Sequence, residues 1–225
     1  MCGRYLLSYD LEDLIKILEE RWNIRQPNID YYEPSYNIAP GQKIIALYKE
    51  NNEVAAGSFR WGIEPSWSKN KSRLLINARS ETVEEKSTFR DSYSNRRCLI
   101  LTNGFYEWKR NGGKTPYYIT LNEAGLFSYA GLWDYYNDNG IMKKACSILT
   151  MESNGSMSKI HNRMPVILNA SQEKIWLSEN YKDQDLLNPM DSSLLHIHEV
   201  SSYVNKWSNN SKKCIEPVVN EQISF

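Results

Sequence analysis

Apolar residues recur with two different periods along this chain of 225 residues. Near the N-terminus they are mostly three or four positions apart, which places side chains on one face of an α-helix. These residues are Leu11, Leu14, Ile15 and Leu18. Asp10 and Asp13 add acidic groups at the start of the same stretch, where they stabilise a helix N-terminus. The pattern predicts an amphipathic helix over residues 10–23.

From residue 43 to residue 151 the apolar runs have the length of β-strands and are separated by Asn- and Gly-containing turn sequences. The predicted strands are 43–49, 54–61, 74–79, 97–102, 105–110, 117–121, 126–136 and 143–151, with one more near 196–204. Short helices are predicted at 81–87, 156–160 and 171–178. The proline-containing stretch 26–41 is predicted to be an ordered loop. These elements form a mainly antiparallel sheet system.

Composition narrows the class of protein. Hydrophobic residues make up 41% of the chain and charged residues 24%, as in soluble globular proteins. No apolar run approaches the ~18 residues of a membrane-spanning helix, and no secretory signal opens the chain, so a cytoplasmic or nuclear protein is expected. The cysteines and histidines show neither a disulfide framework nor metal-ligand spacing. They are Cys2, Cys98, Cys146, Cys214, His161, His196 and His198.

Charge is unevenly distributed although the net charge is zero. The segment from Arg60 to Lys114 has 12 Lys or Arg against 6 Asp or Glu, a net +6, which leaves 15 against 21, a net −6, elsewhere. A local basic surface in a neutral protein is what phosphate binding requires. A solvated face without a partner explains the same numbers, so charge by itself leaves both readings open.

The first residues, Met1-Cys2-Gly3-Arg4, place a cysteine at the extreme N-terminus if Met1 is removed. Cys2 then carries a free amine and a thiol on adjacent carbons. Because an α-amine titrates near ~7.7 to 8.0 and a lysine near ~10.4, the free-base fraction at Cys2 is roughly a few hundred times that of a lysine. The pair can close a five-membered thiazolidine on an aldehyde carbon. The alternative is an ordinary buried cysteine.

Two strand-like runs carry polar groups among apolar residues. Asn77 and Arg79 share one strand face, where an amide beside a guanidinium can orient a carbonyl or a phosphate. Glu107 follows Phe105 on one face and lies between two aromatics in sequence, so burial is expected to raise its pKa and suit it to acid/base work. A polar strand edge and a salt bridge to Lys109 are the respective alternatives.

Two further segments suggest chemistry. His161 precedes an apolar strand and can protonate a sugar oxygen, although a lone histidine is more often structural. Arg60, Trp61 and Trp67 interleave arginine with tryptophan, as a stacking surface for unpaired bases does. Aromatic core packing is the alternative for these tryptophans.

Taken together, six motifs in order resemble the SRAP domain (SOS response-associated peptidase) proteins, the abasic-site processing family. The motifs run from residue 2 to about 168. They are Met1-Cys2-Gly3-Arg4-Tyr5, Tyr36-Asn37-Ile38-Ala39-Pro40-Gly41, Trp61-Gly62 with Pro65-x-Trp67, Ile76-Asn77-Ala78-Arg79-x-Glu81, Gly104-Phe105-Tyr106-Glu107-Trp108 and His161-x-Arg163-x-Pro165.

The resemblance implies a sensor that captures abasic sites in single-stranded DNA as a covalent cross-link during the DNA damage response. It implies Cys2 as nucleophile, Glu107 as proton shuttle, His161 as its partner at the sugar and Asn77 as the group that orients the amine. The DNA-contacting residues it implies are Arg4, Asn37, Trp67, Arg79, Trp108, Thr150 and Arg163. The family's peptidase label refers to release of residues that precede the cysteine.

With the resemblance, the predicted fold is α+β: a single domain over 1–225, with antiparallel sheets curled into a barrel-like core, short flanking helices and the N-terminus in a basic groove. The part beyond about residue 170 matches least. A monomer without metal or cofactor is expected. Two other functions stay open: an N-terminal-nucleophile glutamine amidotransferase-like hydrolase, which also begins Met-Cys-Gly, and a non-covalent single-stranded DNA-binding protein.

Overall fold

A closed ring of five strands organises the molecule, and the computed structural model describes residues 2–65, 74–109, 114–122, 125–178 and 184–218. Each strand of the ring pairs with the next, and the last pairs with the first. In ring order the strands are β10 (Ile141–Glu152), β4 (Glu53–Trp61), β3 (Lys43–Glu50), β6 (Arg97–Thr102) and β9 (Phe127–Asp138). The predicted barrel-like core is therefore confirmed. All its pairs are antiparallel except β10 with β4.

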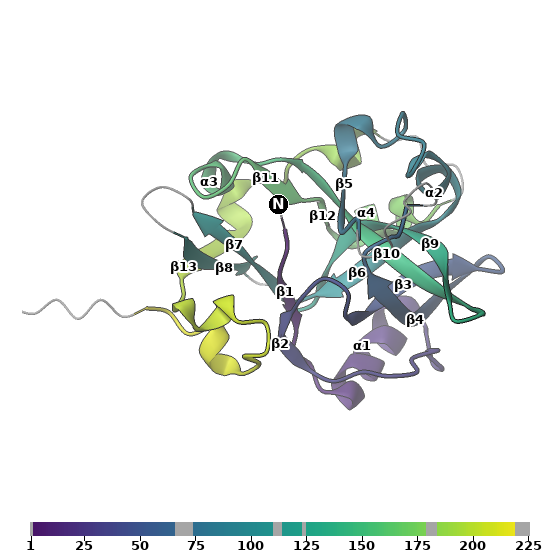
Figure 1. Ribbon diagram of the computed structural model, residues 1–225, viewed down its shortest axis with the longest axis horizontal. Helices are drawn as coiled ribbons and strands as arrows, with labels where there is room; N and C mark the ends of the chain where they lie inside the picture. Colours follow the sequence, from purple (N-terminus) through teal and green to yellow (C-terminus); the bar gives the residue numbers. More distant parts are fainter. Residues whose placement is uncertain (1, 66–73, 110–113, 123–124, 179–183, 219–225) are drawn as a thin grey trace, which may run out of the picture.

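Three short strands extend the barrel beside β9 and β10: β5 (Asn77–Arg79), β11 (Arg163–Pro165) and β12 (Ile167–Leu168). A second sheet of five strands lies next to it (Figure 1). Its strand order is β13 (Leu195–Glu199), β8 (Thr115–Leu121), β7 (Gly104–Lys109), β1 (Tyr5–Leu7) and β2 (Ser35–Ile38). Because β1 is an inner strand of this sheet, the N-terminal end of the described chain lies in the middle of the molecule (Figure 1).

Aromatic packing fixes β1 against the barrel. Tyr5 is fully buried and meets Trp61 and Tyr129 edge to face, with ring centroids 5.0 and 6.0 Å apart. A second apolar cluster joins the neighbouring residue Leu6 to the C-terminal part of the chain through Val200 and Val204. Strand β1, which begins three residues after Cys2, is therefore packed on both faces.

Four α-helices in the described residues cover the sheets. They are α1 (Leu11–Trp22), α2 (Arg90–Asn95), α3 (Gly155–Ser158) and α4 (Ala170–Trp176). Helix α1 matches the predicted amphipathic helix, since Leu14 and Leu18 are buried and Asn23 ends it in the left-handed conformation. The 3₁₀ turns are η1 (Ser80–Thr82), η2 (Gln184–Leu187), η3 (Ser192–Leu194), η4 (Ser202–Asn205) and η5 (Lys212–Cys214).

Several sequence predictions are wrong. Residues 81–87 form no α-helix; the range begins inside the 3₁₀ turn η1. The strand predicted over 74–79 is shortened to β5. Strand β2 lies inside the predicted loop, and β1 and α2 were missed. Strands this short are stabilised by pairing with distant parts of the chain, as Tyr5 pairs with Ile38 and Phe105. Their own sequence is too short to show a strand periodicity. No helix in the described part of the chain has the length and apolar character needed to cross a bilayer.

Candidate functional site

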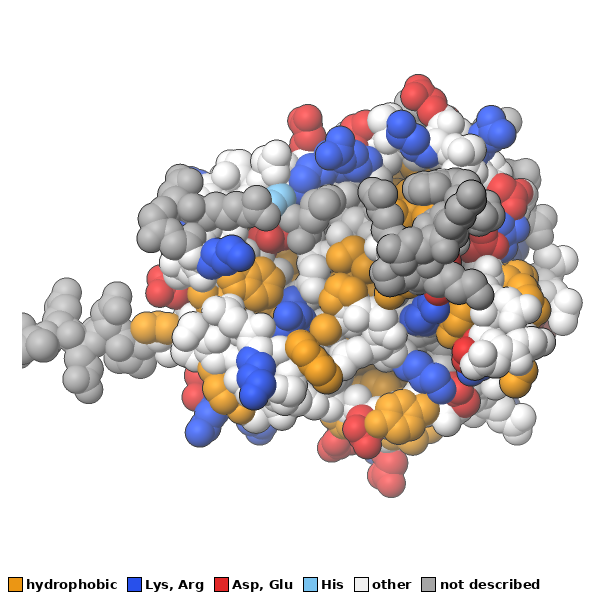
Figure 2. All heavy atoms as spheres, in the orientation of Figure 1, with side chains coloured by type: hydrophobic (Ala, Val, Ile, Leu, Met, Phe, Trp, Pro, Cys, Tyr) orange, Lys and Arg blue, Asp and Glu red, His pale blue; other side chains and the backbone are white. Residues whose placement is uncertain are grey.

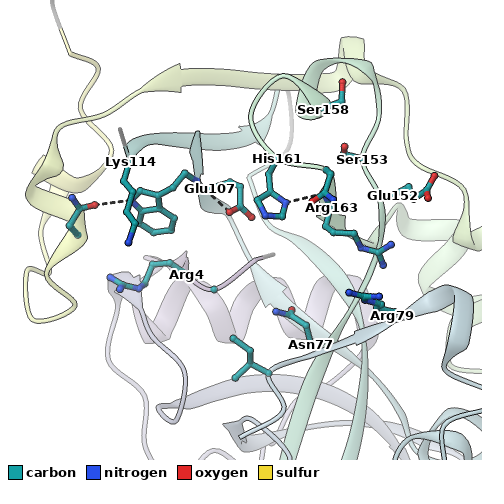
Figure 3. Close-up of a pocket in the computed structure, with 15 residues that line it drawn as sticks. Arg4, Asn77, Arg79, Glu107, Lys114, Glu152, Ser153, Ser158, His161 and Arg163 are labelled. Carbon is teal, nitrogen blue, oxygen red and sulfur yellow. Dashed lines mark hydrogen bonds between the residues drawn. The ribbon is translucent and has the colours of Figure 1, made fainter. Parts of the chain in front are cut away.

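A cavity of about 1180 Å³ lies between the N-terminal end of β1, strand β7, strand β5 and the loop that follows α3 (Figure 3). It brings together residues that are far apart in the sequence. Its lining is Gly3, Arg4, Ile76, Asn77, Arg79, Glu107, Trp108, Lys114, Glu152, Ser153, Ser158, His161, Asn162, Arg163 and Asn205. Seven of the predicted site residues line this cavity: Arg4, Asn77, Arg79, Glu107, Trp108, His161 and Arg163. The described residues contain no cluster of His, Cys, Asp or Glu that can hold a metal ion.

Cys2 is in contact with two residues that line this cavity, its neighbour Gly3 and Asn77. Its side chain is fully buried in the core, and its backbone carbonyl accepts a hydrogen bond of 2.9 Å from Asn77 Nδ2. Burial, and then the negative charge of Glu107, raise the pKa of the Cys2 thiol well above its ordinary value. The thiol is therefore protonated at neutral pH.

Glu107 projects from β7 into the cavity. Alternation along the strand sends Phe105 and Glu107 to one side and Tyr106 to the other, where it joins the second apolar cluster. Of the two sequence neighbours of Glu107, Trp108 lines the cavity and Tyr106 does not. Its side chain is 5% exposed, and Oε1 accepts a 3.3 Å hydrogen bond from the Trp108 backbone N–H.

His161 follows α3, and its backbone N–H donates to the Met157 carbonyl at 2.9 Å. Its Nδ1 lies 3.0 Å from the backbone nitrogen of Arg163, which has only a proton to donate. Nδ1 must therefore be the acceptor, so the neutral ring carries its proton on Nε2. Figure 3 shows the His161 ring and the Glu107 carboxylate pointing toward one another.

Four cationic side chains flank Glu107, with Arg4 and Lys114 on one side and Arg79 and Arg163 on the other (Figure 3). Two of them are already engaged: Arg4 Nη1 donates to Asn37 Oδ1 at 2.7 Å, and Arg163 forms an ion pair with Glu81. Arg79 and Lys114 are exposed and make no ion pair with any residue that the structure describes. Figure 2 shows further Lys and Arg side chains on the face where the N-terminal strand ends.

Two predicted DNA contacts do not reach the cavity. Asn37 is 1% exposed, and its amide nitrogen donates to backbone carbonyls of the C-terminal segment. Thr150 is fully buried and donates to the Ala78 carbonyl at 3.2 Å. Both side chains use their hydrogen-bonding groups inside the protein, and neither lines the cavity. Trp67 lies outside the described residues.

Several lining residues were missed by sequence reasoning. Lys114 ends the basic segment, so its charge was a usable signal. Asn205 was not predictable, because one amide in a polar C-terminal stretch has no distinguishing context. Its Oδ1 accepts a 2.7 Å hydrogen bond from Trp108 Nε1, so the C-terminal part completes the rim. The other missed residues are Glu152, Ser153, Ser158 and Asn162.

The sequence of residues 1–207 matches the family described as SOS response associated peptidase (SRAP). The chain belongs to the SRAP family. A relative named abasic site processing protein YoqW, from Bacillus subtilis (strain 168), is 40% identical over 227 residues, covering 96% of this chain and 99% of the relative. Abasic site processing protein HMCES of Xenopus tropicalis is 30% identical, covering 97% of this chain and 79% of that protein.

Solved structures support the SRAP fold. A Bacteroides thetaiotaomicron protein superposes with a TM-score of 0.84 at 24% identity, covering 97% of this chain and all of that one. A Bordetella bronchiseptica protein gives a TM-score of 0.75 at 23% identity, covering 89% of this chain and 100% of its own. The resemblance read from the six motifs is confirmed at the level of family and fold.

A pH effect on stability is expected at the edge of the SRAP cavity. Hydrogen bonds from Arg163 hold the pKa of Glu81 below its usual range. The pair therefore stabilises the folded protein at pH values above the ordinary Glu pKa of ~4.3, and this stabilisation is lost as the pH falls below that value. Glu81→Gln should therefore melt lower than the parent at pH 6, and the difference should shrink as the pH is lowered below the ordinary Glu pKa. Thermal melts across this range test it; a difference that grows on acidification contradicts it.

Proposed function

We propose that this protein captures abasic sites in single-stranded DNA as a covalent adduct of Cys2, formed after Met1 has been removed. The observation that carries the proposal is the hydrogen bond of 2.9 Å from Asn77 to the Cys2 carbonyl, which fixes residue 2 at a cavity containing Glu107 and His161. The names of its relatives YoqW and HMCES, both abasic site processing proteins, support the same substrate class.

The chemistry follows from the two nucleophiles of an N-terminal cysteine. The amine attacks the aldehyde carbon of the opened sugar first, because an α-amine with a pKa near ~7.7 to 8.0 has a free-base fraction at neutral pH. Loss of one water gives an imine. The S–H group then adds across the C=N bond: sulfur bonds to carbon and the proton goes to nitrogen, which closes a thiazolidine. The net reaction is a condensation that releases one water and needs no oxidant or metal.

The cavity supplies proton transfer for these steps. Glu107, 5% exposed, can take a proton from the amine and return it to the leaving hydroxyl. The Nε2–H of His161 faces the same space and can donate to the ring oxygen of the sugar as it opens. Asn77 holds the residue 2 carbonyl so that the amine and the thiol stay near the sugar. Each group then has one role in the reaction.

Phosphate binding is assigned to Arg79 and Lys114, because neither side chain makes an ion pair with a residue in the described part of the chain. Arg79 and Lys114 lie on opposite sides of Glu107, so a strand that crosses the cavity can place one phosphate near each. Affinity for undamaged single strands should fall with salt by about 0.7 log units per phosphate contact for each decade of salt. Lys114→Gln should lower that slope by about 0.7, whereas Lys16→Gln on helix α1 should not. Salt titrations measure both, and equal slopes for the three proteins would remove Lys114 from the interface.

The function is tested by incubating the protein with a single-stranded oligonucleotide that carries one abasic site, followed by a denaturing gel without reduction. A slow-migrating adduct is expected. The same oligonucleotide with its sugar reduced to the alcohol has no aldehyde and should give none. Intact-mass measurement should show that the reactive protein lacks Met1. Absence of an adduct from protein that lacks Met1 would contradict the proposal.

A further inference from the structure

The side-chain amide of Asn37 is hydrogen-bonded at both ends. Its Oδ1 accepts a 2.7 Å hydrogen bond from Arg4 Nη1. Its Nδ2 donates to three backbone carbonyls, those of Val204, Lys206 and Asn209, at 3.2, 3.1 and 2.7 Å. Because an arginine only donates and a carbonyl only accepts, one orientation of the amide satisfies all four contacts. One buried side chain therefore joins the start of the chain to its C-terminal part.

The C-terminal part also holds Arg4 directly. Arg4 Nη1 donates to the Val204 carbonyl at 3.0 Å, so Arg4, Asn37 and Val204 are hydrogen-bonded to one another in a closed triangle. Nε of Arg4 is buried and has no hydrogen-bond partner among the residues that the structure describes, so the guanidinium keeps donor capacity at the cavity that it lines. Figure 3 shows Arg4 on the same side of Glu107 as Lys114.

Trp108 is the second cavity residue held by the C-terminal part. Its Nε1 donates to Asn205 Oδ1 at 2.7 Å, and the guanidinium carbon of Arg4 lies 5.9 Å from the centroid of its ring. Asn205 ends the turn η4 and lies between two residues whose carbonyls accept from Asn37. A displacement of this turn therefore moves Arg4 and Trp108 together.

The groups assigned to the chemistry are held by other contacts. The backbone carbonyl of Arg4 accepts a 3.0 Å hydrogen bond from the Tyr106 N–H of strand β7, and the Cys2 carbonyl accepts one from Asn77. Neither contact involves the C-terminal part. Loss of the Asn37 contacts should therefore disturb the side chains at the cavity edge more than the reaction at residue 2.

We propose that Asn37 is a positioning residue for DNA binding, which holds residues 200–218 against Arg4 so that Arg4 and Trp108 form a preassembled edge of the cavity. The part about DNA rests on the proposed function. The part about residues 200–218 does not, because it concerns the protein without DNA. Asn37 does not line the cavity and acts through its neighbours.

The Asn37 contacts are tested by amide hydrogen exchange on the protein without DNA. Asn37→Asp keeps an acceptor for Arg4 but turns a second oxygen toward the three carbonyls, and Asn37→Leu removes both ends. In both variants residues 202–210 should exchange about tenfold faster than in the parent, while strands β6 and β9 stay protected. Asn95→Ala, an exposed amide on helix α2, should change nothing there. Unchanged exchange in both Asn37 variants would overturn the positioning role.

The consequence for DNA is tested by measuring the capture rate against the concentration of abasic single-stranded oligonucleotide. Asn37→Leu should raise the half-saturating concentration about tenfold, the scale on which loss of a hydrogen bond acts, and leave the rate at saturation unchanged. Arg4→Gln should also raise the half-saturating concentration. The double variant should fall well short of the product of the two effects, because both changes disrupt one contact. A full product, or a loss confined to the saturating rate, would overturn the proposal.

Two controls keep these outcomes separate. If thermal melts show that the Asn37 variants do not fold, Asn205→Ala carries the test, since Asn205 is exposed and its truncation removes the bond to Trp108. It should raise the half-saturating concentration and leave the saturating rate unchanged, and an unaltered half-saturating concentration would overturn the proposal. If the parent protein captures no abasic DNA at all, the proposed function fails, and hydrogen exchange still decides whether Asn37 holds residues 200–218.

Discussion

Cys2→Ala should abolish the stable adduct with abasic single-stranded DNA, and Cys2→Ser should form only a transient one. Serine keeps the N-terminal amine, so the imine still forms. Ring closure then depends on a hydroxyl, which is a far poorer nucleophile than a thiol, whose pKa is near ~8.5. Borohydride reduces imines, so it should trap the serine variant, whereas the native adduct should survive denaturing gels without reduction. Gels with and without borohydride measure this.

The serine variant has a second expected product. An imine at the opened sugar acidifies the neighbouring carbon, so Cys2→Ser should cleave the strand by β-elimination more than the parent does. Cys214→Ser is the matched control, because Cys214 is also a buried free cysteine but has no terminal amine. It should cross-link like the parent. A stable adduct that persists in Cys2→Ala would remove Cys2 from the mechanism.

Glu107→Gln should slow both cross-linking and its reversal by something like 10²-fold, the usual scale for loss of a general acid/base. Glutamine keeps the shape of the side chain and can still accept the hydrogen bond from the Trp108 N–H, so the fold should survive. The measurement is a time course of adduct formation at pH 6 to 8 with saturating DNA.

The control for this variant is Glu84→Gln, which removes the same charge from outside the cavity. It should cross-link at the parental rate. If Glu107→Gln also reacts at the parental rate across this pH range, Glu107 has a structural role and proton transfer must be assigned to another group.

Local sequence patterns predicted most of the regular structure, and the motifs included several residues that line the cavity. Helix α1 and strands β3, β4, β6 to β10 have apolar residues at their own period, so each is visible within a short window. The motif around Glu107 predicted which face of β7 the carboxylate shares with Phe105. What these patterns specify is the residue type and its face within one element.

The rest depended on contacts between distant residues. Arg163 and Glu81 are 82 positions apart and Arg4 and Val204 are 200 apart, and no spacing in the sequence relates either pair. Asn37 was placed among DNA contacts because it lies in a family motif, yet three backbone carbonyls of the C-terminal segment enclose its amide. Such pairing becomes visible only in three dimensions.

The most direct test of covalent capture is mass spectrometry of the cross-linked peptide. Protein and abasic oligonucleotide are allowed to react without reductant, digested with protease and nuclease, and sequenced by fragmentation. The predicted result is an adduct on residue 2 of a chain that lacks Met1, with the summed mass of peptide and sugar fragment less one water. An adduct on a lysine, or on Cys98, Cys146 or Cys214, would contradict it.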